Sequence, residues 1–348
     1  MEAVSIAKRT VAAVLIALLA LSTALFMTGC ASKSEASTST DPITLVFLPD
    51  SSSADMSASR DAVAEVIKNA TGRDVDIMTT TDYNVAIEAL VSGRAQMGYL
   101  GPEGYVQAKE KNDAIDCAFT VSDTNGTLDE ACYYSRICVP TENADEYKDG
   151  DTYSIDNIKG KTCSFVSATS TSGFAIPSNV MVKHFGLKSS DEVLEEGKLF
   201  SSTMFGDSHQ GSAVNLLSGN AEVAAFDDEA LVPYVDLVSG EPNAVGSVYQ
   251  IKADADAPFD SVRGKQFTVI QSTPVMNSPF VFNSDTLDEE TRQAITDAFC
   301  SEETANNPAI FSDPNDEDAV ALQEKTSEKT CYIPVEDSWY DPIRNLGE

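Results

Sequence analysis

A helix–turn–strand unit occurs twice in this chain, and this repetition constrains the fold more than any other feature of the sequence. Residues 86–100 can be laid over residues 213–226 if one residue is deleted. Each copy predicts a helix, a Ser-Gly turn and a buried strand. A unit repeated so far apart indicates two similarly built lobes, and chance similarity between two such units is the alternative.

Helix-like and strand-like stretches alternate along the rest of the chain, which is typical of an α/β protein. We place the boundary between the lobes in a strand at 133–139, with the chain returning near 268–272. Lobe 1 then comprises residues 43–139 and 270–348, and lobe 2 comprises residues 140–269. Two crossings make a two-strand hinge, and ligands favour the cleft between two such lobes.

The first 30 residues have the pattern of an export signal. A short basic segment precedes an apolar run at residues 11–26, which ends at Met27-Thr28-Gly29-Cys30. This end resembles the bacterial lipobox, with Cys30 as the lipidated residue. A plain cleaved signal or a membrane helix also fits the apolar run, but small residues followed at once by cysteine favour a lipoprotein. Residues 31–42 would be a flexible tether, and no other segment is apolar enough to span a bilayer.

The charge of the chain restricts its partners. The sequence has 55 acidic and 23 basic residues, which give a formal net charge of −32. Such a chain is a poor partner for nucleic acid, whose phosphates require clustered lysine and arginine, and for an anionic membrane surface. Membrane contact is therefore expected only through the lipid. A small anionic ligand stays compatible, because local hydrogen-bond donors can outweigh a distant net charge.

Seven cysteines are present, and six remain if Cys30 is lipidated. An even number in an exported protein permits disulfides. We favour a bond between Cys300 and Cys331, since both lie in the C-terminal segment; the alternative is that the cysteines are small buried hydrophobic residues. No C-x-x-C spacing suggests a metal site, and we expect neither a metal nor a cofactor.

Two polar segments could contact a small anion. Ser170-Thr171-Ser172-Gly173 follows a strand and precedes a helix, where hydroxyls and free backbone N–H groups would form an anion nest. Plain capping of the helix is the alternative. His209 lies in a polar turn before the second helix of the repeat and could donate to an anion, although a lone histidine is often incidental.

Acidic and aromatic residues complete the candidates. Asp227, Asp228 and Glu229 end the strand of the second repeat and could accept from a hydroxyl or an amine, or simply begin a helix. Tyr83 and Tyr133 could donate to a ligand or could pack in the core. The chain lacks the short motifs of serine hydrolases, nucleoside triphosphatases and metalloproteases, so we expect a binding protein and not an enzyme.

The motifs of this chain and their order along it resemble those of the phosphate/phosphite/phosphonate-binding proteins of ABC importers. The resemblance extends from about Ile43 to about Phe299 and is weaker beyond it. It rests on Thr81-Asp82-Tyr83, Tyr99 to Pro102, Tyr133 to Ser135, Ser170 to Phe174 with Pro177, Ser208-His209, and Val223 to Glu229. It implies a two-lobed, type II periplasmic-binding-protein fold, an extracytoplasmic monomer and an ABC transporter permease as partner.

The resemblance also implies roles for individual residues. The donors to a phosphorus oxyanion (phosphonate, phosphite or phosphate) would be Tyr83, Tyr133, Ser170, Thr171, Ser172 and His209. Glu229 matches an acidic position that holds a ligand amine in some members, and Asp227 or Asp228 could substitute for it if the register is off by a residue. Ser278 stands where aminophosphonate binders have a second acid, which favours ligands without an amine.

The resemblance further implies that the ligand drives closure of the lobes and that the closed form is recognised by the transporter. Two non-enzymatic alternatives stay open from the sequence, besides an enzyme built on a binding-protein scaffold. One is a solute-binding protein for a different small organic ligand, because fold alone does not fix the ligand. The other is a ligand sensor that reports to a signalling receptor.

Overall fold

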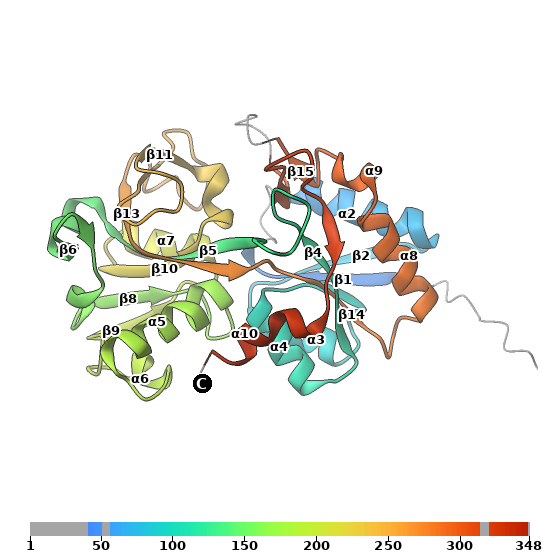
Figure 1. The fold of residues 1–348 in the computed structure, drawn as a ribbon, viewed down its shortest axis with the longest axis horizontal. Helices are drawn as coiled ribbons and strands as arrows, with labels where there is room; N and C mark the ends of the chain where they lie inside the picture. The colour runs from blue at the N-terminus through green and yellow to red at the C-terminus, as the bar shows by residue number, and fades with distance from the viewer. Residues whose placement is uncertain (1–40, 51–55, 314–319, 347–348) are drawn as a thin grey trace, which may run out of the picture. The chain divides into compact units, whose positions relative to one another are not determined.

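The computed structural model describes residues 41–50, 56–313 and 320–346, which form two α/β lobes (Figure 1). The predicted export signal, Cys30 and the tether up to residue 40 lie outside the described residues and stay predictions. Among the described residues, no helix is both long enough and apolar enough to cross a membrane.

The first lobe is built on a six-stranded sheet in the order β2-β1-β3-β14-β4-β17. The first three strands of this order are parallel, whereas β14 runs antiparallel to both of its neighbours and β17 runs antiparallel to β4. The bounds are Ile43–Phe47 (β1), Val75–Thr79 (β2), Met97–Tyr99 (β3), Ile115–Val121 (β4), Phe280–Asn283 (β14) and Tyr332–Pro334 (β17).

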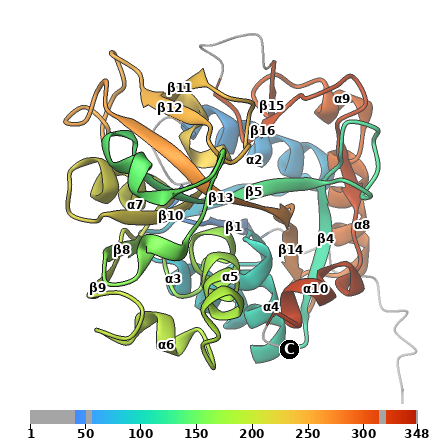
Figure 2. The same ribbon diagram turned by 60° about the vertical axis from the view of Figure 1, so that its left-hand side comes forward.

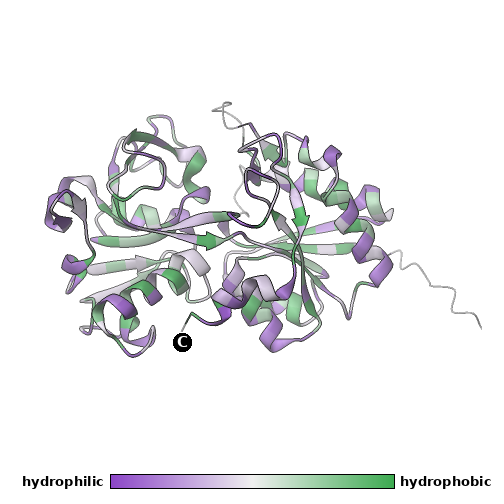
Figure 3. Ribbon diagram, viewed as in Figure 1, coloured by the Kyte–Doolittle hydropathy of each residue, from purple (hydrophilic) through white to green (hydrophobic). Residues whose placement is uncertain are grey.

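Alternation along β1 shows how this sheet is buried on both faces. Ile43, Leu45 and Phe47 belong to a cluster with residues of α2 and α8, whereas Val46 belongs to a cluster with α3, α4 and α10. Hydrophobic residues therefore line the strands and the inward faces of the helices (Figure 3). The helices are Ser57–Thr71 (α2), Tyr83–Val91 (α3), Pro102–Lys111 (α4), Glu289–Phe299 (α8), Glu302–Ala305 (α9) and Asp341–Arg344 (α10).

The second lobe is built on a seven-stranded sheet in the order β9-β8-β10-β5-β13-β12-β11. Here β9, β8 and β10 are parallel, and β5 runs antiparallel to both β10 and β13. The bounds are Cys132–Pro140 (β5), Thr162–Phe165 (β8), Ser202–Phe205 (β9), Val223–Asp227 (β10), Val235–Ser239 (β11), Val248–Ile251 (β12) and Gln266–Met276 (β13).

Helices cover both faces of the second sheet as well. One face packs against α5 and α6, and the other against α7 and the 3₁₀ helix η5. A single turn of π-helix, η4, leads into α5. The bounds are Thr171–Ala175 (η4), Ile176–Phe185 (α5), Asp191–Leu194 (α6), His209–Leu217 (α7) and Glu229–Tyr234 (η5). The short pairs β6 with β7 (Lys148–Asp149, Thr152–Tyr153) and β15 with β16 (Phe311–Ser312, Gln323–Glu324) lie outside the two sheets.

The two sheets share one topology. In each sheet, three parallel strands are followed by one antiparallel strand and then by a further strand: β2-β1-β3, β14 and β4 in the first, and β9-β8-β10, β5 and β13 in the second. The repeat seen in the sequence is the second helix–strand step of each lobe, α3 with β3 and α7 with β10. The structure thus confirms that the repeat marks two similarly built lobes.

The chain crosses between the lobes along β5 and β13. These strands pair side by side through nine residue pairs, from Phe267 opposite Pro140 to Met276 opposite Cys132, with an irregularity between Val269 and Gln271 (Figure 2). Both strands that we expected to carry the hinge are therefore part of one ladder. The division of the lobes at residues 139/140 and 269/270 stays a prediction.

The predicted bond between Cys300 and Cys331 is wrong. All six cysteines among the described residues are free thiols. Cys300 packs against the hydrophobic cluster beneath α8, and burial, followed by the neighbouring Cys331, raises its pKa to about 12. A thiol held in its neutral form in an apolar cluster behaves as a small hydrophobic residue, which was the alternative.

Close packing at the start of α7 fixes the turn that carries His209. A Cβ atom on Gly211 would lie 2.0 Å from the backbone oxygen of Gly206. We expect Gly211→Ala to lower the free energy of unfolding by about 2 kcal/mol or more, because the backbone of the turn must move. Urea unfolding measures this. Gly104→Ala is the control, since its Cβ would meet its nearest neighbours at 3.8 Å. Equal stability of the two variants would contradict this packing.

Candidate functional site

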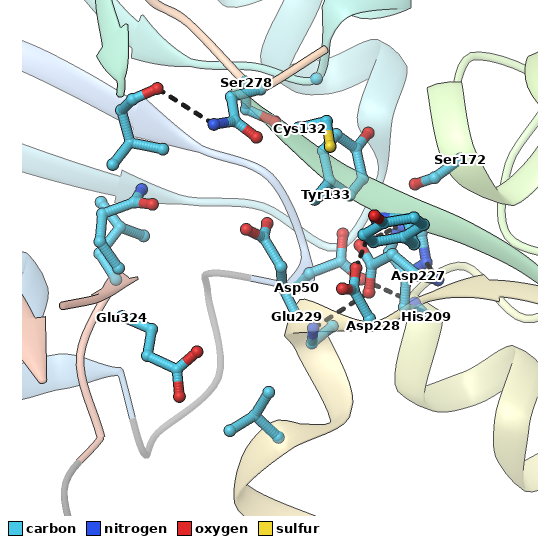
Figure 4. A pocket seen from close by; sticks show the side chains of 18 of the residues that line it. Asp50, Cys132, Tyr133, Ser172, His209, Asp227, Asp228, Glu229, Ser278 and Glu324 are labelled. Atoms are coloured by element: carbon cyan, nitrogen blue, oxygen red, sulfur yellow. Dashed lines mark hydrogen bonds and ion pairs between the residues drawn. The ribbon is translucent and has the colours of Figure 1, made fainter. Parts of the chain in front are cut away.

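A pocket of about 470 Å³ lies between the lobes, a size typical of small-molecule sites (Figure 4). Its walls come from the ends of strands and the starts of helices in both lobes. The structure brings together every residue for which the sequence predicted ligand contact, and all of them line this pocket: Tyr83, Tyr133, Ser170, Thr171, Ser172, His209 and Glu229.

Helix starts converge on the pocket. Tyr83 is the first residue of α3, Gly101 caps α4, Thr171 begins η4 and His209 begins α7, and all four line the pocket. The first N–H groups of a helix have no partner within the helix, and its N-terminal end carries a partial positive charge. The partial positive charges of these helix ends favour an anion in the pocket, but several of the N–H groups are already bonded within the protein, and no lysine or arginine is among the described residues that line it.

The Ser170–Ser172 segment combines capping with contacts between lobes. The Ser170 hydroxyl accepts from the backbone N–H of Gly173 at 3.1 Å, so the capping that we weighed as an alternative does occur. The Thr171 hydroxyl accepts from the backbone N–H of Glu103 in the first lobe at 2.8 Å. Ser172 is buried, and its hydroxyl lies within hydrogen-bonding reach of Tyr133.

Tyr83 and Tyr133 are buried donors. Burial raises the pKa of both hydroxyls well above the usual value, with Asp50 the next contribution at Tyr83. Both side chains therefore keep their proton at neutral pH. The Tyr83 hydroxyl donates a hydrogen bond to the carboxylate of Asp50, a contact that the sequence did not predict.

The ring of His209 is turned toward Asp227. Its Nδ1 accepts from the backbone N–H of Asp227 at 2.9 Å, so the proton of a neutral ring lies on Nε2, which is 3.2 Å from Asp227 Oδ2. We expected the ring to donate to an anion. In the structure the ring faces the carboxylate of Asp227, and the backbone N–H of His209 donates to a second carboxylate, at 2.6 Å from Asp50 Oδ1.

The three consecutive acids have different environments. Asp227 bonds to His209 and accepts from the backbone N–H of Ala230, and Asp228 accepts from Tyr134 N and Asn243 Nδ2. In the described part of the chain, the carboxylate of Glu229 has no hydrogen bond or salt bridge. It is accessible from the pocket, while the surrounding protein disfavours its charge. Of the three acids, Glu229 is therefore the one whose carboxylate is available to a ligand.

Neighbouring charges raise the pKa of Glu229 further. The side chain is exposed in the pocket, but desolvation by the surrounding protein is the main cause of the increase, followed by Asp228, Asp227 and Glu324. Glu324 reaches the pocket from the C-terminal segment, away from the other acids in the sequence (Figure 4). Burial and then Asp228 raise the pKa of Glu324 as well. Glu324 therefore adds a second carboxylate to the pocket that contains Glu229.

Sequence reasoning missed Asp50 and Glu324. Asp50 closely follows the first strand, and carboxyl ends of parallel strands are where binding residues gather, so that position carried a usable signal. Glu324 lies in a two-residue strand, β16, within a segment of irregular structure. Nothing in its local pattern places it near Glu229.

This fold and pocket define a two-lobed solute-binding protein, and comparison with known proteins identifies the family. Residues 45–340 match the family described as ABC transporter, phosphonate, periplasmic substrate-binding protein. The chain belongs to this family, whose members are transport components and not enzymes.

Individual relatives agree with this. The chain is 25% identical over 226 residues to the phosphate-import protein PhnD of Mycolicibacterium smegmatis, covering 64% of this chain and 67% of the relative. The structure is similar to that of PhnD1 from Prochlorococcus marinus, solved in complex with methylphosphonate (TM-score 0.63, 15% identity, 88% and 97% of the two chains).

A binding-protein component of a phosphonate ABC transporter from Pseudomonas aeruginosa is also similar (TM-score 0.62, 16% identity, 88% and 86% of the two chains). At these identities the structural likeness establishes the fold alone. It is the type II fold of periplasmic binding proteins, as the sequence predicted.

The environment of Asp227 predicts how stability depends on pH. Burial raises its pKa to about 6, against the opposing effect of His209 and with the help of Asp50 and Asp228. The unfolded chain loses this proton first as the pH rises. As the pH rises from about 4 to about 6, Asp227 therefore lowers the free energy of unfolding progressively, by at most about 3 kcal/mol, and the loss persists at higher pH.

We expect Asp227→Asn to remove this decline, so that the free energy of unfolding of the variant rises relative to that of the wild type between pH 4 and pH 7. Urea unfolding at several pH values measures the difference. Asp254→Asn, which removes an exposed acid outside the pocket, is the control and should run parallel to the wild type. A parallel profile for Asp227→Asn would contradict the assignment.

Proposed function

We propose that this protein is the solute-binding lipoprotein of an ABC importer and that it binds a small phosphorus oxyanion, namely phosphonate, phosphite or phosphate. The observation that carries the proposal is the convergence of protonated hydroxyls and helix starts on one pocket, at Tyr83, Tyr133, Ser172 and His209. The names of two relatives, a phosphate importer and a protein solved with methylphosphonate, support the same ligand class.

The absence of cations from the described lining favours particular forms of the ligand. Several fixed donors can replace the water around an anion without any lysine or arginine. The acids of the pocket, however, repel a fully ionised ligand. A ligand that keeps a proton on one oxygen, or that carries its own cation, fits the pocket better than a bare dianion.

Binding would hold the lobes together. Thr171 of the second lobe already accepts from Glu103 N at the start of α4 in the first lobe, so an anion bound beside it would contact both lobes at once. Closure of this kind would present a surface to the permease. Lipid on Cys30 would keep the protein at the membrane near that permease.

Calorimetric titration of the purified protein with phosphate, phosphite and methylphosphonate tests the proposal. We expect tight binding of at least one of them, weakened roughly ten- to a hundred-fold by Tyr133→Phe or by Ser172→Ala, because each variant removes one donor to a charged group.

Tyr153→Phe and Ser178→Ala are the matched controls, since neither residue lines the pocket. Both should bind as the wild type does. If a folded protein showed no heat with any of the three ligands, the oxyanion proposal would fail, and a different small organic ligand or a sensor role would become the leading candidate.

A second candidate ligand is a phosphonate that carries an amine. Glu229 has no hydrogen bond or salt bridge in the described chain, and Glu324 faces the same pocket. An ammonium group between two carboxylates would be paired instead of isolated, which removes the cost that Ser278 suggested.

Proton release distinguishes this candidate. The surrounding protein and the neighbouring acids raise the pKa of Glu229, so an ammonium group bound beside it would favour the ionised carboxylate and release any proton that Glu229 holds. We expect titrations of 2-aminoethylphosphonate in buffers of different ionisation enthalpy to show proton release, and those of ethylphosphonate to show less. Glu229→Gln should abolish the difference, and Glu324→Gln should reduce it. Equal proton release with the two ligands would exclude the amine-bearing ligand.

A further inference from the structure

An acid of the first lobe occupies the donors that the oxyanion needs. Asp50 lies just beyond β1, and its two carboxylate oxygens accept from two different groups. Oδ2 accepts from the Tyr83 hydroxyl. Oδ1 accepts from the backbone N–H of His209 at 2.6 Å. The first donor belongs to the first lobe and the second to the second lobe, so a single carboxylate joins the lobes.

Neither donor can serve two acceptors well. A tyrosine hydroxyl has one proton, and burial keeps that proton on Tyr83. The N–H of His209 is the first of α7 and has no partner within the helix. A ligand oxygen can therefore bond fully to either group only after Asp50 has released it.

The geometry points to Asp50 as an affinity-determining residue, a carboxylate that stands in for an oxygen of the ligand and competes with it for Tyr83 and the N–H of His209. This inference rests on the proposed function, since it assumes that the ligand is an oxyanion. The resemblance to other binding proteins assigned Tyr83 and His209 to the ligand and gave no role to Asp50.

Competition of this kind has two effects. It weakens binding, because part of the interaction energy of the ligand is spent on releasing Asp50. It also favours contact between the lobes before any ligand arrives, since Asp50 bonds to α7 of the opposite lobe.

The test compares Asp50→Asn with Glu130→Gln. Both variants remove one negative charge from a residue that lines the pocket, but Glu130 makes no contact with Tyr83 or His209 in the described structure. We expect Asp50→Asn to tighten calorimetric binding of methylphosphonate, or of phosphate if that is the better ligand, by about ten-fold or more. Glu130→Gln should change it by less than about two-fold.

A second measurement needs no ligand. Hydrogen exchange of the peptide that contains His209 should be faster in Asp50→Asn than in the wild type and unchanged in Glu130→Gln, because the neutral amide leaves a single, weaker acceptor oxygen for the Tyr83 hydroxyl and the N–H of His209. Weaker binding by Asp50→Asn would overturn the inference, as it would show that Asp50 accepts a proton from the ligand. An effect no larger than that of Glu130→Gln would overturn it as well.

Failure of the proposed function would be distinguishable. If neither the wild type nor Asp50→Asn bound any phosphorus oxyanion, both the proposed function and the inferred competition would be wrong. Faster exchange at His209 in that same variant would still establish the contact between Asp50 and α7.

Discussion

The antiparallel pairing of β5 with β13 is the interaction on which the rest of the structure depends. Nine residue pairs hold these strands together where the chain passes from one lobe to the other and back. The same β5 pairs on its other edge with β10. Beyond the end of that ladder, Asp228 accepts from Tyr134 N at 2.7 Å. One strand therefore carries Tyr133 into the pocket, joins the crossings and fixes the acids that end β10.

The electrostatic design of the pocket relies on dipoles instead of cations. With a net charge of −32, the chain is compatible with an anionic ligand only if local groups oppose that charge. Helix starts and buried hydroxyls do so at short range, where water does not screen them. Asp227 contributes indirectly, because its bonds to His209 fix which ring nitrogen carries the proton and how the first turn of α7 is oriented.

Much of the fold could be predicted from the sequence because its signals are local. Asp82 caps α3 and Gly72 ends α2 in a left-handed conformation, as the residue types indicate. The candidate ligand residues were identified by motif order, and they do converge. What failed depended on long-range packing: the pairing of Cys300 and the arrival of Glu324 opposite Glu229 depend on segments far apart in the sequence. The orientation of the His209 ring depends on a neighbour 18 residues away.

The first sheet contains strands that precede the second lobe in the chain and strands that follow it, and this has a consequence for the order of folding. The first sheet needs β14 between β3 and β4, and β14 follows the whole of the second lobe in the chain. The second sheet likewise needs β13, one of the last strands of its lobe. Contacts of such long sequence separation form slowly. A chain emerging from a translocation pore cannot complete its first sheet until β17, which ends at Pro334, has passed through.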